Sequence, residues 1–344
     1  MTSSSPCRRW LAPAVLLSGI GAVVWPVPAL AHVKWFAVYD LAAAPRPLPE
    51  LWSPAFGELA LLSVLAICAA SRIEVTGVGT ALLSGLDRLT TGLRVGTEQF
   101  MRTALAIFFT ALWVNGSFIL TPELGTTDPA VAWFQAVIAV GLLWRRTMLF
   151  SGLGIAYLYV LGTESYGVFH MMDYPIFLSV AAYFVLTGLG RTLFELRPID
   201  VVRWGTAITL MWASVEKWAY PDWTYPLLKA KAHLTMGLSP DFFMTASGLV
   251  EFGLAFGLVC TPLVRRLSAV TLASIFVSAV FEFGKMDAIG HLPIIAVLVA
   301  LAVDNAPAER RPIALVPAWY CAALAAFVVV YYSAHVLFQH VPAT

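Results

Sequence analysis

The chain contains ten apolar stretches, each of roughly the 20 residues that a helix needs to cross the hydrocarbon core of a bilayer. Because 60% of the 344 residues are hydrophobic and only 12% are charged, a water-soluble fold has too little polar surface to cover them. We therefore predict an all-α, polytopic membrane protein, embedded in a lipid bilayer, with about ten transmembrane helices. The predicted spans are 54–71, 103–120, 129–145, 147–164, 174–190, 200–219, 242–262, 266–284, 289–304 and 314–334.

The arginines between the predicted spans fall in alternate loops. Loops rich in lysine or arginine stay in the cytoplasm, so we predict that these loops are cytoplasmic. The loop arginines are Arg72, Arg88, Arg94, Arg102, Arg145, Arg146, Arg191, Arg197, Arg203, Arg265, Arg266, Arg310 and Arg311. Arg46 falls on the other side, together with all histidines and all lysines. We expect a multi-pass protein of a bacterial inner (plasma) membrane, with both mature termini in the periplasm.

Residues 1–31 have the pattern of a secretory signal peptide. Two arginines precede an apolar run over 10–25, and the small-x-small sequence at 29–31 is a cleavage site. Cleavage there makes His32 the first mature residue. A retained first transmembrane helix is the alternative.

Two further segments are not predicted to cross the membrane. Residues 32–53 are rich in proline and too polar, and they form a periplasmic N-terminal arm. The region 54–102 holds the first transmembrane helix and a cytoplasmic amphipathic segment, in which 76–98 alternate apolar and polar residues at helical spacing. This segment is either an amphipathic helix on the cytoplasmic membrane face or an ordinary cytosolic linker helix.

The chain also shows a weak internal repeat. Trp113 precedes Pro122-Glu123 by the same interval as Trp212 precedes Pro221-Asp222. In each block a later outer loop contains Asp, His and then Pro, at 170–175 and at 287–293. These patterns predict two parallel four-helix units, 103–190 and 200–304, followed by a last transmembrane helix at 314–334. Chance is the alternative, because proline is common at helix starts.

Several ionisable residues lie within predicted spans or near their ends, where charge is costly and indicates function. Glu251 lies about half-way along its span, and Glu282 and Lys285 share one helical face. We predict an outward-facing polar site that handles protons or anchors a substrate. Its predicted residues are Glu216, Lys217, Glu251, Glu282 and Asp287, with His291 beside them. A structural ion-pair network that joins four helices is the alternative.

Histidine and methionine on the same side also suggest a copper site. The segment His170-Met171-Met172 offers an imidazole and two thioethers, a ligand set that copper accepts. His32 would chelate through its free amine and its ring, and His291 lies in the corresponding loop of the second unit. Copper binding or transport, with a periplasmic metal carrier as partner, is thus an alternative function. Methionines that only pack and a histidine left by the peptidase are the competing interpretation.

The chain lacks the motifs of several other chemistries. It has no Gly-rich phosphate loop, no HExxH, no GxSxG and no CxxCH sequence. The net charge is +1, and no basic cluster with interleaved aromatic residues is present. We therefore expect no nucleic-acid partner.

The segment from Trp212 to Pro221, WASVEKWAYP at the end of an apolar helix, resembles the DoxX/DoxD-like membrane protein superfamily. Phe283-Gly284-Lys285 and Gly290-His291-Leu292-Pro293 are similar to the closing half of such a four-helix unit. The resemblance covers 200–304 and, more weakly, 103–190, where 115–118 supply no Glu-Lys pair. It implies a redox role in the inner membrane that is linked to quinone, with other redox membrane subunits as partners. A structural or assembly factor of a membrane complex is a third possibility.

Overall fold

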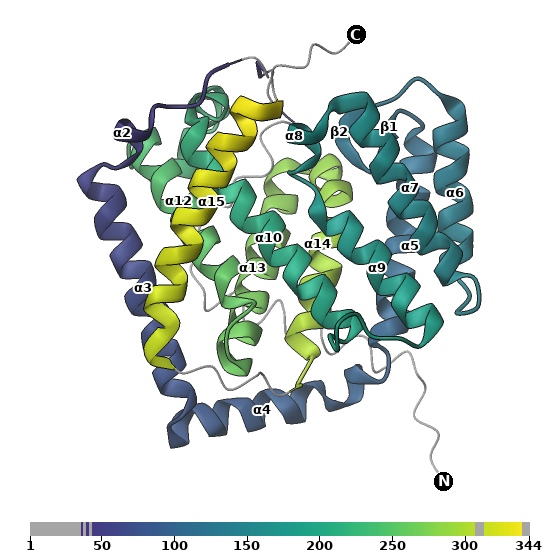
Figure 1. Cartoon of the computed structure of the whole chain (residues 1–344), viewed down its shortest axis with the longest axis horizontal. Coiled ribbons are helices and arrows are strands. Elements are labelled where there is room, and N and C mark those ends of the chain that lie inside the picture. Colours follow the sequence, from purple (N-terminus) through teal and green to yellow (C-terminus); the bar gives the residue numbers. More distant parts are fainter. Residues whose placement is uncertain (1–35, 37–38, 41–42, 307–312, 339–344) are drawn as a thin grey trace.

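The computed structural model describes residues 36, 39–40, 43–306 and 313–338. The predicted signal peptide, His32 and the arginines at 310–311 lie outside the described residues. The described chain is almost entirely helical, with one two-stranded hairpin (Figure 1).

The helices follow the order of the predicted spans. The long ones are α3 (Pro54–Glu74), α4 (Gly77–Arg94), α5 (Thr97–Asn115), α6 (Pro129–Leu142), α7 (Met148–Tyr166), α9 (Pro175–Leu189), α10 (Pro198–Ala219), α12 (Pro240–Gly257), α13 (Pro262–Phe283), α14 (Lys285–Val303) and α15 (Val316–Phe338). The short elements are α2 (Leu48–Leu51), β1 (Phe118–Ile119), β2 (Thr121–Gly125), α8 (Val168–Met171), η2 (Pro221–Trp223), α11 (Tyr225–Ala230), η3 (Ala232–Thr235) and η4 (Ile313–Leu315).

Proline and short polar side chains mark where the helices begin. Helices α3, α6, α9, α10, α12 and α13 all start at a proline, whose fixed φ suits the first helical position. Ser53, Asp128 and Ser239 each accept a hydrogen bond from a first-turn amide of the helix that follows. The helix starts are therefore encoded locally.

Among the described residues, four helical segments are long and apolar enough to cross a membrane by length and composition. They are α3, α13, α14 and the continuous segment Ile313–Phe338. Helices α6 and α9 are apolar but have only 14 and 15 residues. At 1.5 Å per residue they rise about 21–23 Å, which is less than the ~30 Å hydrocarbon core.

The structure differs from the predicted span at 103–120. Helix α5 begins six residues earlier, at Thr97, and ends at Asn115 because Gly116 adopts a left-handed conformation (φ 75°). The chain then forms the antiparallel β1–β2 hairpin instead of continuing as a helix. Buried Gln135 of α6 stabilises this hairpin: its amide donates to the Phe118 carbonyl (2.9 Å) and accepts from the Leu120 amide (3.3 Å).

The predicted outer loop at 287–293 is wrong, because these residues form the first turns of α14. Gly284, at φ 79°, separates α13 from α14, and the new helix begins at Lys285. Pro293 lies inside the helix. Asp287 and His291 therefore lie four residues apart on one buried helical face, rather than in a flexible loop.

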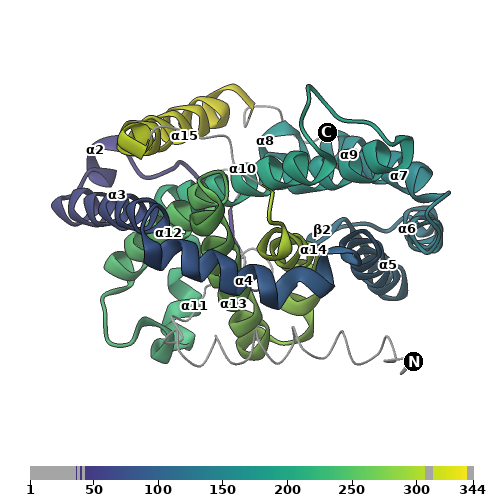
Figure 2. The ribbon, with the colours of Figure 1, turned by 90° about the horizontal axis from the view of Figure 1, so that it is seen from below.

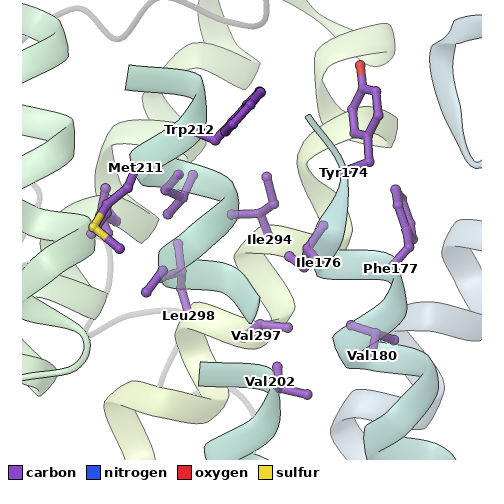
Figure 3. Close-up of a cluster of buried hydrophobic side chains, with 14 of the residues drawn as sticks. Tyr174, Ile176, Phe177, Val180, Val202, Met211, Trp212, Ile294, Val297 and Leu298 are labelled. Atoms are coloured by element: carbon purple, nitrogen blue, oxygen red, sulfur yellow. The ribbon is translucent and has the colours of Figure 1, made fainter. Parts of the chain in front are cut away.

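The two predicted four-helix units pack against each other along their length. Helix α10 contacts both α9 and α12, and α14 contacts both α13 and α5. Figure 3 shows apolar side chains from α9, α10 and α14 meeting in this contact, among them Ile176, Met211 and Val297. Tyr174 lies at the edge of the cluster, with its hydroxyl directed away from the apolar side chains (Figure 3).

One end of the helix bundle carries an arginine network, and we call it the arginine end. Arg266 of α13 reaches Asp87 of α4 (2.8 Å) and donates to the Ala302 carbonyl of α14 (2.8 Å). Arg197, just before α10, pairs with Asp304 just after α14 (3.0 Å). Helix α4 crosses this end of the bundle, where it contacts α3, α13 and α14 (Figures 1 and 2).

The opposite end, which we call the histidine end, carries all four histidines of the described chain. They are His170 in α8, His233 in η3, His291 in α14 and His335 in α15. The N-terminal arm is fixed here through Arg46, whose amide donates to the Ala219 carbonyl at the end of α10 (2.7 Å). The hydroxyl of Tyr332 in α15 donates to the Arg46 carbonyl (2.6 Å). Apart from Arg46, the arginines of the described chain and its histidines thus lie at opposite ends of the bundle, as their alternation along the chain predicts.

Candidate functional site

A buried carboxylate, that of Glu123 in β2, is the centre of the polar groups at the histidine end. Its side chain is 2% exposed. The Tyr39 hydroxyl donates to Glu123 Oε1 (2.6 Å), and the Tyr174 hydroxyl donates to Oε2. His170 Nε2 lies 2.8 Å from Oε1. We call these four residues the Glu123 cluster.

Local turns place the Glu123 cluster. Leu120 adopts a positive φ (62°) between the two strands, and this tight turn brings β2 back along β1. Gly167, at φ 84°, ends α7 and starts α8, which carries His170. Two residues separate α8 from Tyr174, the N-cap of α9. A hairpin and a short helix are thus held together, and neither alone could surround the carboxylate.

A second buried carboxylate lies next to the cluster. Trp212 Nε1 of α10 donates to Asp173 Oδ1 (2.8 Å), and both side chains are buried. The Trp212 ring also packs on Tyr331 of α15, with 4.6 Å between ring centroids. Phe169 contacts both rings from α8. Glu216, a predicted site residue, is half-buried on α10 one helical turn beyond Trp212.

A further carboxylate–imidazole pair lies inside α14. His291 Nδ1 is 2.9 Å from Asp287 Oδ2, and both side chains are fully buried. The Phe276 ring of α13 packs on His291, with 4.6 Å between centroids. Each predicted four-helix unit therefore contributes one buried pair of a carboxylate and a histidine. The pairs are built differently, because Glu123 comes from the hairpin while Asp287 lies on the same helix as its partner.

The remaining predicted site residues form two separate ion pairs. Lys217 Nζ of α10 lies 2.5 Å from Glu251 Oε2 of α12, and the two side chains are 16% and 14% exposed. Glu282 at the end of α13 pairs with Lys231 (2.5 Å) and His233 (3.2 Å). The predicted single cluster is thus divided into pairs, each of which already has its counter-charge.

The structure also separates the predicted copper ligands. His170 faces Glu123, while the thioether of buried Met171 packs so close to Gly162 of α7 that a methyl group added at Gly162 would lie 3.1 Å from the sulfur. His291 belongs to the pair in α14, and His32 lies outside the described residues. No group of three or more His, Cys, Asp or Glu side chains within the described ranges could hold a metal ion. Copper binding stays a prediction.

Sequence reasoning missed the residues that surround His170. Asp173 and Tyr174 stand in the same HMMDYP segment, and Glu123 stands in the Pro122-Glu123 pair of the internal repeat. The sequence singles out the first segment for its possible copper ligands and the second for the internal repeat. No sequence pattern marks Tyr39 as a site residue, because only the folded N-terminal arm brings its hydroxyl to the Glu123 carboxylate.

The fold and this site define a mainly helical protein with several helices long and apolar enough to cross a membrane and with buried carboxylates at one end. No family model matches the chain, and neither a curated protein nor a solved structure matches it. Its function must therefore be argued from its own residues.

Proposed function

We propose that the protein is a multi-pass inner-membrane protein of ten spans whose histidine end faces outward. Helices at all ten predicted positions support this proposal, as does the arginine network at one end of the bundle with the described histidines at the other. The positive-inside rule then assigns the arginine end to the cytoplasm. The two mature termini lie on the periplasmic side.

Within that membrane, we propose a DoxX-like component of a quinone-linked redox system that holds and exchanges a proton at the Glu123 cluster. The observation that carries this proposal is a nearly inaccessible carboxylate in contact with two phenols and an imidazole. Burial disfavours a bare carboxylate, and an adjacent imidazole provides a group that can share its proton. Such a cluster is suited to proton transfer rather than to simple ion pairing.

The surroundings of the cluster fit this chemistry. Oxidation of a quinol releases two protons and two electrons, so a quinone-linked site needs a proton acceptor. Tyr39 is only half-buried and connects the carboxylate to the N-terminal arm, which provides an exit toward the aqueous side. The rings of Phe169, Trp212 and Tyr331 provide an aromatic wall for a planar headgroup. The electrons would pass to a redox subunit acting as partner.

The proposal is tested by removing the charge of Glu123 without changing its size. Glu123→Gln should abolish quinol-dependent electron transfer in membranes of cells that lack the native gene and carry the variant. Glu164→Gln is the matched control, because Glu164 is an exposed carboxylate at the end of α7 on the same side. Membrane abundance of each variant is measured by immunoblot.

Retained activity in Glu123→Gln, at normal abundance, would remove the cluster from the proposed function. If Glu123→Gln reduces abundance and leaves the activity per molecule unchanged, the structural or assembly role is favoured instead. Binding is measured separately, as quenching of tryptophan fluorescence when decylubiquinone is added to purified protein in lipid nanodiscs.

A further inference from the structure

We propose that α4 lies flat in the surface of the lipid bilayer at the arginine end, with one face inserted among the acyl chains. The inference rests on the membrane location proposed above and is independent of any redox role. It chooses between the two interpretations of this segment that the sequence leaves open.

The side chains of α4 divide into three sectors around the helix. Asp87, Thr90 and Arg94 share the sector that faces the protein, and they hydrogen-bond to one another and to Arg266. A second sector is apolar and exposed; it consists of Val78, Leu82 and Leu89, which are 65%, 48% and 55% exposed. A third sector is polar and exposed; it consists of Thr80, Ser84, Arg88 and Thr91.

Leu83, Leu86 and Leu93 are half-buried in the same inward sector, as expected of a helix packed on a protein. A helix packed on a soluble domain has no second apolar side, whereas α4 has one that faces away from the protein. The inward face is held by charged hydrogen bonds as well as by these leucines, and the exposed apolar stripe of Val78, Leu82 and Leu89 is left without a protein neighbour among the described residues. A stripe of large aliphatic residues beside a polar stripe is the pattern of a helix that lies in the membrane interface. The polar sector then faces the cytoplasm.

The position of α4 directly after a candidate span also indicates that this helix lies at the membrane surface. Helix α3, a candidate span, ends at Glu74, and only two residues separate it from the start of α4 at Gly77. The end of a span lies at the boundary of the hydrocarbon layer, so α4 must start there too. Its axis crosses the end of the bundle instead of continuing the direction of α3 (Figure 1).

The apolar stripe also continues the lipid-facing surface of α3. Ile73 near the end of α3 is 44% exposed, Val75 in the linker is 67% exposed, and Val78 follows on α4. A partner protein would need a separate apolar surface to cover this stripe. The bilayer that surrounds α3 already supplies one, so the lipid is the occupant.

The test measures the depth of spin labels in full-length protein reconstituted in phosphatidylcholine–phosphatidylglycerol vesicles. The background variant has its four cysteines replaced by alanine, and single cysteines are introduced at Leu82, Leu89, Ser84 and Thr91. A fifth label at Leu62, which is 60% exposed on α3, reports whether that span lies in lipid. Collision with oxygen and with a water-soluble nickel chelate is measured for each label.

We expect the labels at 82 and 89 to collide severalfold more with oxygen than with the nickel chelate. The labels at 84 and 91 should show the opposite preference. Equal nickel access at all four α4 positions, with the label at 62 still in lipid, would overturn the inference and leave the membrane location intact. Protection of 82 and 89 from both reagents would also overturn it, because it would indicate a covering protein or a second copy. Nickel access at position 62 would instead contradict the membrane location itself.

Discussion

His170 Nε2 lies 2.8 Å from Glu123 Oε1, and both side chains are almost completely buried. The pair joins the hairpin after α5 to the short helix before α9, two segments that are 47 residues apart in the sequence. Because the Tyr39 hydroxyl donates to the same oxygen, the N-terminal arm is tied to this pair as well. The buried Glu123 carboxylate thus depends on three separate parts of the chain.

Glu123 is expected to change protonation in the folded protein. Burial opposes the charged form of the Glu123 carboxyl group, so a protonated-acid band should appear and disappear with pH in infrared difference spectra. Glu123→Gln should remove this band, while Glu164→Gln should leave it unchanged. An unaltered spectrum in Glu123→Gln would show that another acid carries the signal.

Lys217 and Glu251 are expected to depend on each other for stability. Glu251→Gln or Lys217→Met alone leaves one charge without its partner and should reduce the free energy of unfolding by about 3–5 kcal/mol. The double variant should recover most of this loss, because neither charge remains. The cycle is measured by thermal unfolding in detergent. Additive losses would mean that the 2.5 Å contact is not energetically coupled.

Close packing of α7 on α9 is expected to require a glycine at position 152. A methyl group added there would lie 2.8 Å from the Ala181 carbonyl oxygen, so Gly152→Ala should destabilise the protein by about 1–3 kcal/mol. Gly57→Ala is the control, because no atom lies within 4 Å of the added methyl group. It should be neutral or stabilising by about 1 kcal/mol or less. Equal effects of the two substitutions would contradict the predicted helix contact.

Arg266 is expected to be the strongest link at the arginine end. Its side chain is 1% exposed and contacts both α4 and α14. Arg266→Met should remove the hydrogen bonds to Asp87, Thr90 and the Ala302 carbonyl and lower stability by about 1–3 kcal/mol, because Asp87 is 44% exposed and keeps Arg94 as a partner. Arg146 is exposed, and Arg146→Met should change the free energy of unfolding by no more than about 0.5 kcal/mol. Thermal unfolding of both variants in the same detergent makes the comparison.

Alkaline pH is expected to loosen the arm near Arg46. Burial raises the pKa of the Tyr225 phenol, and its hydrogen bond to Asp241 (3.0 Å) raises it further, while Arg46 lowers it. A folded-state pKa above the usual value of about 10 means that the folded protein holds this proton more tightly than the unfolded chain. This contribution to stability is complete below pH 10 and is lost as pH rises further. Tyr225→Phe should therefore weaken the fall in melting temperature above pH 10, and an unchanged profile would contradict this assignment.

Much of the architecture could be predicted because it depends on local patterns. Proline and capping residues set the helix starts, and the ten apolar stretches all contain helices. The alternation of arginine between loops predicts which helix ends lie at the same end of the bundle, and the contacts of Arg266 and Arg197 agree with this prediction. The hairpin could not be predicted, because the apolar residues Phe118, Ile119 and Leu120 continue the apolar pattern of α5. The helix ends where Gly116 adopts a left-handed conformation, and that conformation is seen only in the structure.

The candidate site could be predicted only in part. The sequence singles out His170, Glu216 and His291 by residue type, because charge and imidazole stand out in an apolar chain. Their partners could not be found in this way. Glu123 stands beyond the predicted end of a span, and only the turn at Leu120 brings it against His170.

The sequence by itself determined that this chain is helical, where most helices begin, and which residues are too polar to be left without a partner. These properties depend on apolar composition and on interactions over a few residues. The tertiary structure alone decided which charge meets which. It paired Lys217 with Glu251, His170 with Glu123, and Arg266 with Asp87, across 34, 47 and 179 residues. Such pairs depend on helix packing and on the direction of each side chain, and neither can be read from spacing along the chain.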